Sequence, residues 1–173
     1  PNLTYTPKAN YHGADSFTFK ANDGSADSNV ATISFTVNPV NDAPVSNAQS
    51  VTTNEDTAKP ITLVGTDVDN EALTYTVVSQ PSNGTLSGTA PNLTYKPKAN
   101  YHGADAFTFK ANDGTADSNI VVVLITVTTV NDAPTFARGG DQPVLEDASA
   151  QTVNNWATAI SPGSVAEADQ HLT

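Results

Sequence analysis

The acidic residues of this chain are the ones whose type and spacing could do chemistry. Of its 18 acids, 14 are Asp and only 4 are Glu. Asp prefers turns and caps, and its carboxylate is a hard oxygen ligand for cations. In the middle of the chain the acids recur as Glu55, Asp67-Val68-Asp69, Asp105, Asp113 and Asn131-Asp132. Side chains of this kind, if the fold gathers them, are typical of a divalent-cation site.

An internal repeat determines where these acids lie. Residues 1–44 align with residues 91–134 without a gap, at a period of 90, and agree at 33 of 44 positions. This period is too long for a solenoid unit, which rarely exceeds about 50 residues, and suits a small domain with its own core. Both copies end in VNDAP. We therefore predict the C-terminal half of a repeat at 1–44, a complete repeat at 45–134, and the N-terminal half of a following, more divergent repeat at 135–173, all within a longer tandem array.

The complete repeat has the alternating pattern of β-strands throughout, clearest at Phe107, Phe109 and Ala111 against Thr108 and Lys110. The predicted strands are 49–53, 61–66, 72–79, 84–88, 92–96, 105–111 and 118–129. Seven short strands in about 90 residues, with no helical run between them, are typical of an antiparallel Greek-key sandwich. The predicted fold class is therefore all-β, built from tandem seven-stranded Greek-key β-sandwiches of the immunoglobulin-like kind.

In such a sandwich the loops gather at two poles, which would bring the acids of neighbouring repeats together. Asp67, Asp69 and Asp113 would share the pole that faces the preceding junction at Asn41-Asp42. Like charges gathered in this way repel unless a counter-ion lies between them. Ca²⁺ takes about 6–8 oxygens from carboxylates, carbonyls and Asn amides, whereas Mg²⁺ demands a stricter octahedron. The sequence therefore predicts Ca²⁺ at the junctions.

At the opposite pole, Glu55 and Asp105 would face the next junction, Asn131-Asp132. The flanking half repeats add acids at corresponding places, such as Asp15, which aligns with Asp105. The complete set of predicted calcium ligands is Asp15, Asn41, Asp42, Asp67, Asp69, Asp113, Glu55, Asp105, Asn131, Asp132, Glu167 and Asp169.

Four of these motifs occur in the order found in cadherin repeats, and the chain resembles most closely the bacterial cadherin-like tandem forms. Asn54-Glu55-Asp56 resembles the Glu motif near the first cadherin strand, and Asp67-Val68-Asp69 resembles the DxD loop. Ala111-Asn112-Asp113-Gly114 and VNDAP are similar to the AxDxG turn and the DxNDNAP linker. The cadherin LDRE motif is absent, and Asp105 and His102 in ANYHGAD are the candidates to replace its ligand. The linker also has fewer acids, which implies fewer or weaker ions per junction.

Composition excludes several other classes. A net charge of −11 and an isoelectric point near 4.2 argue against binding to nucleic acid or to an anionic membrane. The absence of Cys excludes disulfides, Cys-ligated zinc and thiol catalysis. No apolar run approaches the about 18–20 residues of a membrane span. His12 and His102 lie near Asp residues, but no Ser has a nucleophile-elbow context, so we expect no enzyme.

The resemblance implies a calcium-binding structural repeat that rigidifies an extended bacterial surface or secreted adhesin, and so an extracellular protein. Its expected partners are neighbouring repeats, with lateral copies or a cell-surface glycan or protein as further candidates. Val122 and Leu124 on the outward face of the last strand would form a small lateral patch. The alternative is a carbohydrate-binding or spacer module of a secreted polysaccharide-acting protein, although the chain has one Trp and no row of aromatics.

Overall fold

The computed structural model describes residues 2–163, which form strands and no helix. The strands are β1 Gly13–Phe19, β2 Ala31–Val37, β3 Val45–Ser46, β4 Gln49–Asn54, β5 Lys59–Thr62, β6 Gly65–Thr66, β7 Thr74–Ser79, β8 Gly84–Thr89, β9 Asn92–Pro97, β10 Gly103–Asn112, β11 Val121–Thr128, β12 Thr135–Arg138 and β13 Ala157–Ser161. The prediction of an all-β, immunoglobulin-like fold is confirmed. In this part of the chain there is accordingly no helix long and apolar enough to cross a membrane.

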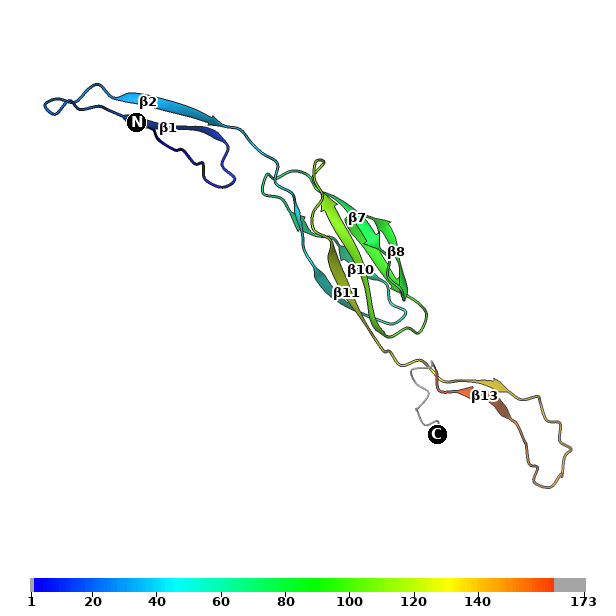
Figure 1. Cartoon of the computed structure of the whole chain (residues 1–173). Helices are drawn as coiled ribbons and strands as arrows, with labels where there is room; N and C mark the ends of the chain where they lie inside the picture. The colour runs from blue at the N-terminus through cyan, green and yellow to red at the C-terminus, as the bar shows by residue number, and fades with distance from the viewer. Residues whose placement is uncertain (1, 164–173) are drawn as a thin grey trace.

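Residues 45–128 form one sandwich, drawn from cyan to olive in Figure 1. One sheet has the order β4-β11-β10-β7 and the other has the order β5-β9-β8, while β3 and β6 make a short additional ladder. The predicted strand at 61–66 is divided in two, because β5 pairs with β9 whereas β6 pairs with β3. The sandwich therefore contains nine strand segments where the alternation predicted seven.

The register of β10 and β11 places their apolar side chains on the inner face. Phe107 lies opposite Val123 and Asp105 opposite Ile125, in an antiparallel ladder. Tyr95 from β9 meets these residues from the other sheet, and Tyr95, Phe107, Phe109, Val123 and Ile125 are the largest fully buried side chains. The core thus lies between the two sheets, as period-two alternation requires.

One pairing differs from the antiparallel pattern of the rest of the sandwich. β4 pairs with β11 in parallel, with Val123 opposite Gln49 and Thr128 opposite Asn54. β4 therefore runs beside the last strand and in the same direction along the long axis of the sandwich. This arrangement brings Asn54-Glu55 to the pole from which the chain leaves toward the next segment.

A two-stranded hairpin flanks the sandwich on each side (Figure 1). In the first, β1 pairs with β2 from Gly13↔Val37 to Phe19↔Ala31, which is the register of β10 with β11. In the second, β12 pairs with β13. The first hairpin lies beyond one end of the sandwich and the second beyond the other, so the three parts follow one another along a line. The repeat boundaries at 44 and 134 stay a prediction; β3 begins at Val45 and β12 at Thr135.

Candidate metal centre

Three carboxylates gather on the loop that follows β6. Asp67, Asp69 and Glu71 each offer an oxygen, and these oxygens lie within 4.8 Å of one another. The backbone N–H of Asp69 donates to Oδ1 of Asp67 at 2.7 Å, and Asn70 has a positive φ of 64°. Asn tolerates this left-handed conformation well. The tight turn thereby holds residues two and four positions apart on the same side of the loop.

The preceding junction reaches into this cluster. The backbone N–H of Asp42 donates to Oδ2 of Asp69 at 2.8 Å, and Nδ2 of Asn41 donates to Oδ2 of Asp113 at 3.0 Å. Sequence separations of 27 and 72 residues are bridged by these two contacts. The structure thus brings together five of the predicted ligands, namely Asn41, Asp42, Asp67, Asp69 and Asp113. They come from the junction, the loop after β6 and the turn after β10.

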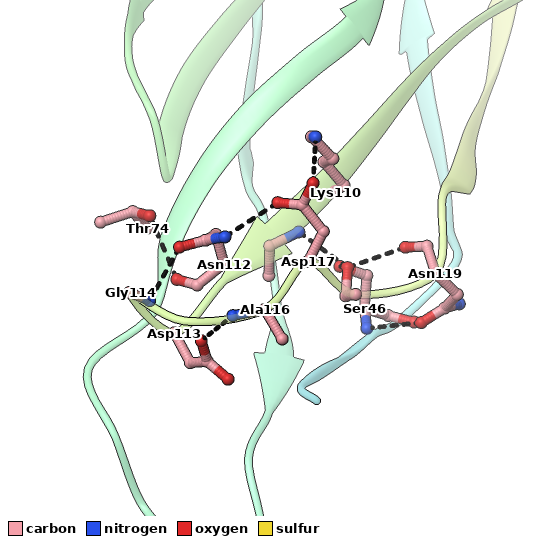
Figure 2. Close-up of polar contacts among 11 residues, drawn as sticks. Ser46, Thr74, Lys110, Asn112, Asp113, Gly114, Ala116, Asp117 and Asn119 are labelled. Atoms are coloured by element: carbon pink, nitrogen blue, oxygen red, sulfur yellow. Dashed lines mark hydrogen bonds and ion pairs between the residues drawn. The ribbon is translucent and has the colours of Figure 1, made fainter. Parts of the chain in front are cut away.

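The turn after β10 fixes the position of Asp113, as Figure 2 shows. Oδ1 of Asp113 accepts hydrogen bonds from the backbone N–H groups of Thr115 and Ala116, both at 2.6 Å. Oδ1 of Asn112 accepts from Gly114 at 2.7 Å, and Gly114 has the positive φ of 100° that favours glycine. These bonds hold Oδ1 of Asp113 inside the turn and leave Oδ2 directed to Asn41.

The carboxylates at this pole lie close together, and the pKa of Glu71 reflects its desolvation and their repulsion. Desolvation raises the pKa of Glu71, and repulsion by Asp67, Asp69 and Asp113 raises it further. Oδ2 of Asp67 is buried and has no hydrogen-bond partner among the described residues. Backbone N–H groups, foremost that of Ala116, and the Asn41 amide lower the pKa of Asp113, so it stays ionised. A buried carboxylate oxygen without a donor, beside other carboxylates, fits a hard divalent cation.

Sequence reasoning missed Glu71 as a member of this cluster. It follows Asp69 by two residues and is one of only four Glu in the chain. Spacing of two places side chains on the same side only along an extended segment, and this segment turns at Asn70. The sequence therefore carried no clear signal for Glu71.

At the opposite pole the central residue is Glu55, which is only 3% exposed. Its Oε1 accepts a hydrogen bond from the backbone N–H of Val130 at 2.7 Å, while Oε2 is buried without a partner in the described part of the chain. Nδ2 of Asn131 donates to the carbonyl of Asp132 at 3.1 Å. Glu55 is thus bonded to the start of the linker that carries Asn131-Asp132. Its second oxygen, like Oδ2 of Asp67, has no hydrogen-bond partner among the described residues.

Asp105, predicted for the same pole, accepts hydrogen bonds from several protein donors. Its carboxylate accepts hydrogen bonds at 2.9 Å from the backbone N–H groups of Ser82, Asn83 and Ala106 and from the hydroxyl of Tyr95. Desolvation raises the pKa of Tyr95, and the bond to Asp105 raises it further. These contacts hold the turn before β8 against β10. Calcium ligation by Asp105 stays a prediction. His102, the other candidate for the same ligand, is exposed.

The remaining predicted ligands lie in the flanking segments. Asp15 accepts hydrogen bonds from the Tyr5 hydroxyl at 2.9 Å and from the backbone of Ser16 at 2.7 Å, which repeats part of the Asp105 pattern. It is not one of the three acids whose oxygens gather after β6, and its role as a ligand also stays a prediction. Glu167 and Asp169 lie outside the described residues.

Several known proteins are similar to parts of this chain. Integrin beta-like protein B of Dictyostelium discoideum is 39% identical over 87 residues, which is 49% of this chain and 4% of that protein. The crystal structure of human CDH23 EC21-23 matches with a TM-score of 0.50 and 19% identity, covering 86% of this chain and 53% of that one. An endo-fucoidan hydrolase from glycoside hydrolase family 107 matches with a TM-score of 0.43 and 30% identity, covering 72% of this chain and 20% of that one.

The CDH23 match shares the sandwich fold, in keeping with the resemblance inferred from the motifs. The model of the bacterial Ig domain family matches residues 1–36 and 41–126. That match covers well over half of the chain and most of both copies of the repeated segment. The chain is therefore a member of the bacterial Ig domain family, with a cadherin-like sandwich.

Proposed function

We propose that this chain is a calcium-binding structural repeat that rigidifies an extended bacterial surface or secreted adhesin and so supports cell adhesion. The observation that carries the proposal is the acidic cluster of Asp67, Asp69 and Glu71. Asp69 of the cluster accepts a hydrogen bond from the Asp42 backbone, and the adjoining Asp113 accepts one from Asn41, so residues from both sides of the junction meet at the cluster. A cation bound there would be held by two neighbouring parts of the chain at once.

The chain's own residues explain why the junction would be stiff only with the ion present. Carboxylates gathered within a few ångströms repel, as the raised pKa of Glu71 indicates. Bound Ca²⁺ would supply two positive charges that cancel this repulsion. Asn41-Asp42 would then be fixed against the loop after β6, and the short linker 38–44 could no longer bend. Without the ion, two hydrogen bonds join the linker to these acids.

A second site is proposed at the other pole. Glu55 holds the backbone of Val130 with one oxygen, and its other oxygen is buried without a partner in the described part of the chain. A bound cation would satisfy that oxygen and draw in Asn131-Asp132. Each end of the sandwich would then carry calcium, as expected for a unit that continues a rod in both directions. Affinity in the range of about 10⁻⁴–10⁻³ M suits an extracellular module, and a cytosolic protein would encounter too little calcium.

Calorimetric titration with Ca²⁺ tests the metal site directly. The wild-type chain should give saturable binding heat, and the Asp67→Asn, Asp69→Asn double variant should lose the component that comes from this cluster. Asp141→Asn is the matched control, because Asp141 is highly exposed and pairs with Arg138 far from the cluster. The absence of binding heat at millimolar Ca²⁺ would refute the calcium site.

Small-angle X-ray scattering tests the mechanical part of the proposal. The maximum particle dimension should fall when EGTA removes calcium, because the junctions then bend. The double variant should show the shorter dimension even with calcium present. A dimension that stays the same with and without calcium would contradict rigidification, while leaving binding itself to the calorimetric result.

A further inference from the structure

One dipeptide of the sandwich is chemically labile. Asn83 is followed by Gly84, and no other Asn in this sequence precedes a Gly. In an Asn-Gly pair the backbone nitrogen of Gly attacks the side-chain amide carbon of Asn readily, because Gly has no Cβ to obstruct the approach. The pair lies at the start of β8 and contains none of the residues proposed as calcium ligands.

The reaction at such a pair needs only water. The Gly nitrogen forms a bond to Cγ of Asn, its proton goes to the amide nitrogen, and ammonia leaves a succinimide ring behind. Water then opens the ring. Cleavage of the bond to Cγ gives Asp, whereas cleavage of the bond to the backbone carbonyl carbon gives isoaspartate, whose main chain runs through the former side chain. One water is consumed and one ammonia is released, without an oxidant or an enzyme.

The folded sandwich holds Asn83 by three hydrogen bonds. Its backbone N–H donates to Oδ2 of Asp105 at 2.9 Å, and its carbonyl accepts from the backbone N–H of Lys98 at 2.9 Å. Its side-chain Nδ2 donates to the Tyr101 hydroxyl at 3.0 Å. Ring closure rotates the side chain and the following peptide toward each other and expels Nδ2. The bond to Tyr101 must therefore break before the product can form.

The peptide that would attack is held as well. Gly84 lies opposite Pro97 in the antiparallel ladder of β8 with β9. Its backbone packs so closely on the fully buried Tyr95 that an added Cβ would lie 2.5 Å from Cζ of that ring and 2.7 Å from the carbonyl oxygen of Lys96. Rotation of the Asn83-Gly84 peptide thus requires this end of the ladder to open.

The Asp product does not fit the site that Asn83 occupies. The Tyr101 hydroxyl donates to the carbonyl of Ala104 at 2.5 Å, so it presents a lone pair to Asn83. An ionised carboxylate has no donor, so two acceptors would face each other there. The new charge would also lie close to the carboxylate of Asp105, which is only 8% exposed and binds the Asn83 backbone.

The isoaspartate product fits no better. It lengthens the main chain between Asn83 and Gly84, which displaces Gly84 from its place opposite Pro97. The close packing of Gly84 on Tyr95 leaves little space for this displacement. Both products therefore favour the unfolded chain over the sandwich.

We propose that Asn83-Gly84 is a site of spontaneous deamidation that the folded sandwich protects and an unfolded chain exposes. Once the reaction has occurred, the turn before β8 cannot return to its native hydrogen bonds. Unfolding of this repeat thus becomes irreversible with time, because the unfolded chain is modified while it waits to refold. The site acts independently of calcium, so the proposal goes beyond the stiffening of the junctions.

A comparison of rates in the folded and the denatured chain tests the protection. The whole chain is incubated in mildly alkaline buffer with and without guanidinium chloride, and peptide mass mapping follows Asn, Asp and isoaspartate at each position. Asn83 should react first in the denatured chain. In the folded chain it should react more than about tenfold more slowly, since several hydrogen bonds must open beforehand. Equal rates, or faster reaction of another Asn in the denatured chain, would overturn the proposal.

Refolding of a partly modified sample tests the consequence. The denaturant is diluted when about half of the molecules have reacted, and size-exclusion chromatography separates compact from unfolded chains. The compact fraction should retain Asn83, and the unfolded fraction should be enriched in Asp and isoaspartate at this position. The same proportion of products in both fractions would show that the modified chain refolds, which contradicts the proposal.

Variants separate this site from other slow chemistry. Asn83→Asp should lower the melting temperature, whereas Asn154→Asp, with the same change of charge at an exposed position, should leave it nearly unchanged. Asn83→Gln closes the corresponding ring far more slowly and should refold to the same yield before and after incubation in denaturant. It retains the Asp-Gly pairs at Asp23 and Asp113, so it also controls for isomerisation there. Equal melting temperatures of the two Asp variants would show that the product fits the fold and would overturn the proposal.

Discussion

The carboxylates of Asp105 and Asp67 differ in what surrounds their oxygens. Both oxygens of Asp105 accept hydrogen bonds from protein donors, whereas Oδ2 of Asp67 is buried with none among the described residues. Glu55 combines the two situations, with one oxygen bonded to Val130 and the other unpaired in the described chain. Residue type alone does not separate a structural carboxylate from a candidate ligand; the donors around each oxygen do.

Replacing Asp105 by Asn should destabilise the sandwich. Asn presents one oxygen and an NH₂ group to four donors, so at least one buried donor loses its acceptor, at a cost of about 1–3 kcal/mol. Chemical denaturation followed by fluorescence of the chain measures this. Asp15→Asn is the matched control, since the corresponding carboxylate lies exposed on the first hairpin and should change stability little. Equal effects of the two substitutions would contradict the structural role of Asp105.

Replacing Glu71 by Gln should stabilise the chain in calcium-free buffer at neutral pH. The folded-state pKa of Glu71 is raised, so folding disfavours its charged form. This penalty is absent below the unfolded pKa of about 4.3 and develops as pH rises through the folded pKa. The gain in melting temperature should thus appear at pH 7 and vanish near pH 3.

Calcium reverses the expected effect of the same substitution. With Ca²⁺ present, Glu71→Gln removes a charged oxygen from the cluster, so the rise in melting temperature on adding calcium should be smaller than in the wild type. Differential scanning calorimetry with and without Ca²⁺ measures both effects. A stabilising effect that persists unchanged at saturating calcium would show that Glu71 is not a ligand.

At the scale of elements, alternation predicted the strands that have one buried face. The predicted 84–88 and 92–96 differ from β8 and β9 by one residue at the C-terminal end. Alternation does not specify which strand is the neighbour, so it could not reveal that β4 pairs with β11 in parallel or that β5 and β6 join different partners. The phase of the repeat predicted which junction residues lie near the acidic cluster. The place of Glu71 in that cluster depends on the path of the backbone after Asn70, which the repeat phase does not specify.

A close approach between β8 and β9 gives a prediction at this scale. A Cβ atom on Gly84 would lie 2.3 Å from Cε2 of the buried Tyr95 and 2.7 Å from the carbonyl oxygen of Lys96. Gly84→Ala should therefore force the two strands apart and cost about 1–3 kcal/mol, as overpacking does. Gly140→Ala is the control, because nothing lies within 4 Å of its added Cβ. Thermal unfolding of the two variants should differ clearly, and equal melting temperatures would contradict the packing argument.

For the whole molecule, the principal feature is a line of one sandwich between two hairpins (Figure 1). Among the described residues, every member of the buried hydrophobic core lies between Ile61 and Val127. The hairpins contribute none of these residues, and the junction contacts come from the linkers at Asn41-Asp42 and Val130. Stability of the sandwich and stiffness of its junctions are therefore separate properties of this molecule.

Removing residues 1–44 tests this separation. In calcium-free buffer the shortened chain should unfold at the same temperature as the full chain, because its core is intact. With calcium the melting temperature of the full chain should rise more, since Asn41 and Asp42, which contact Asp113 and Asp69, can then take part in the metal site. Scanning calorimetry of both forms measures the difference. Equal gains would show that the junction takes no part in binding.

The parallel pairing of β4 with β11 has a consequence for a chain under tension. A pull on the two ends draws β4 toward one pole and β11 toward the other. Because the two strands lie side by side and run in the same direction, the pull acts along the strands and slides them past one another. The six register pairs between Gln49 and Asn54 then bear the load together instead of opening one at a time. The sandwich is therefore arranged to resist shear, the load that a tether between two moving surfaces transmits.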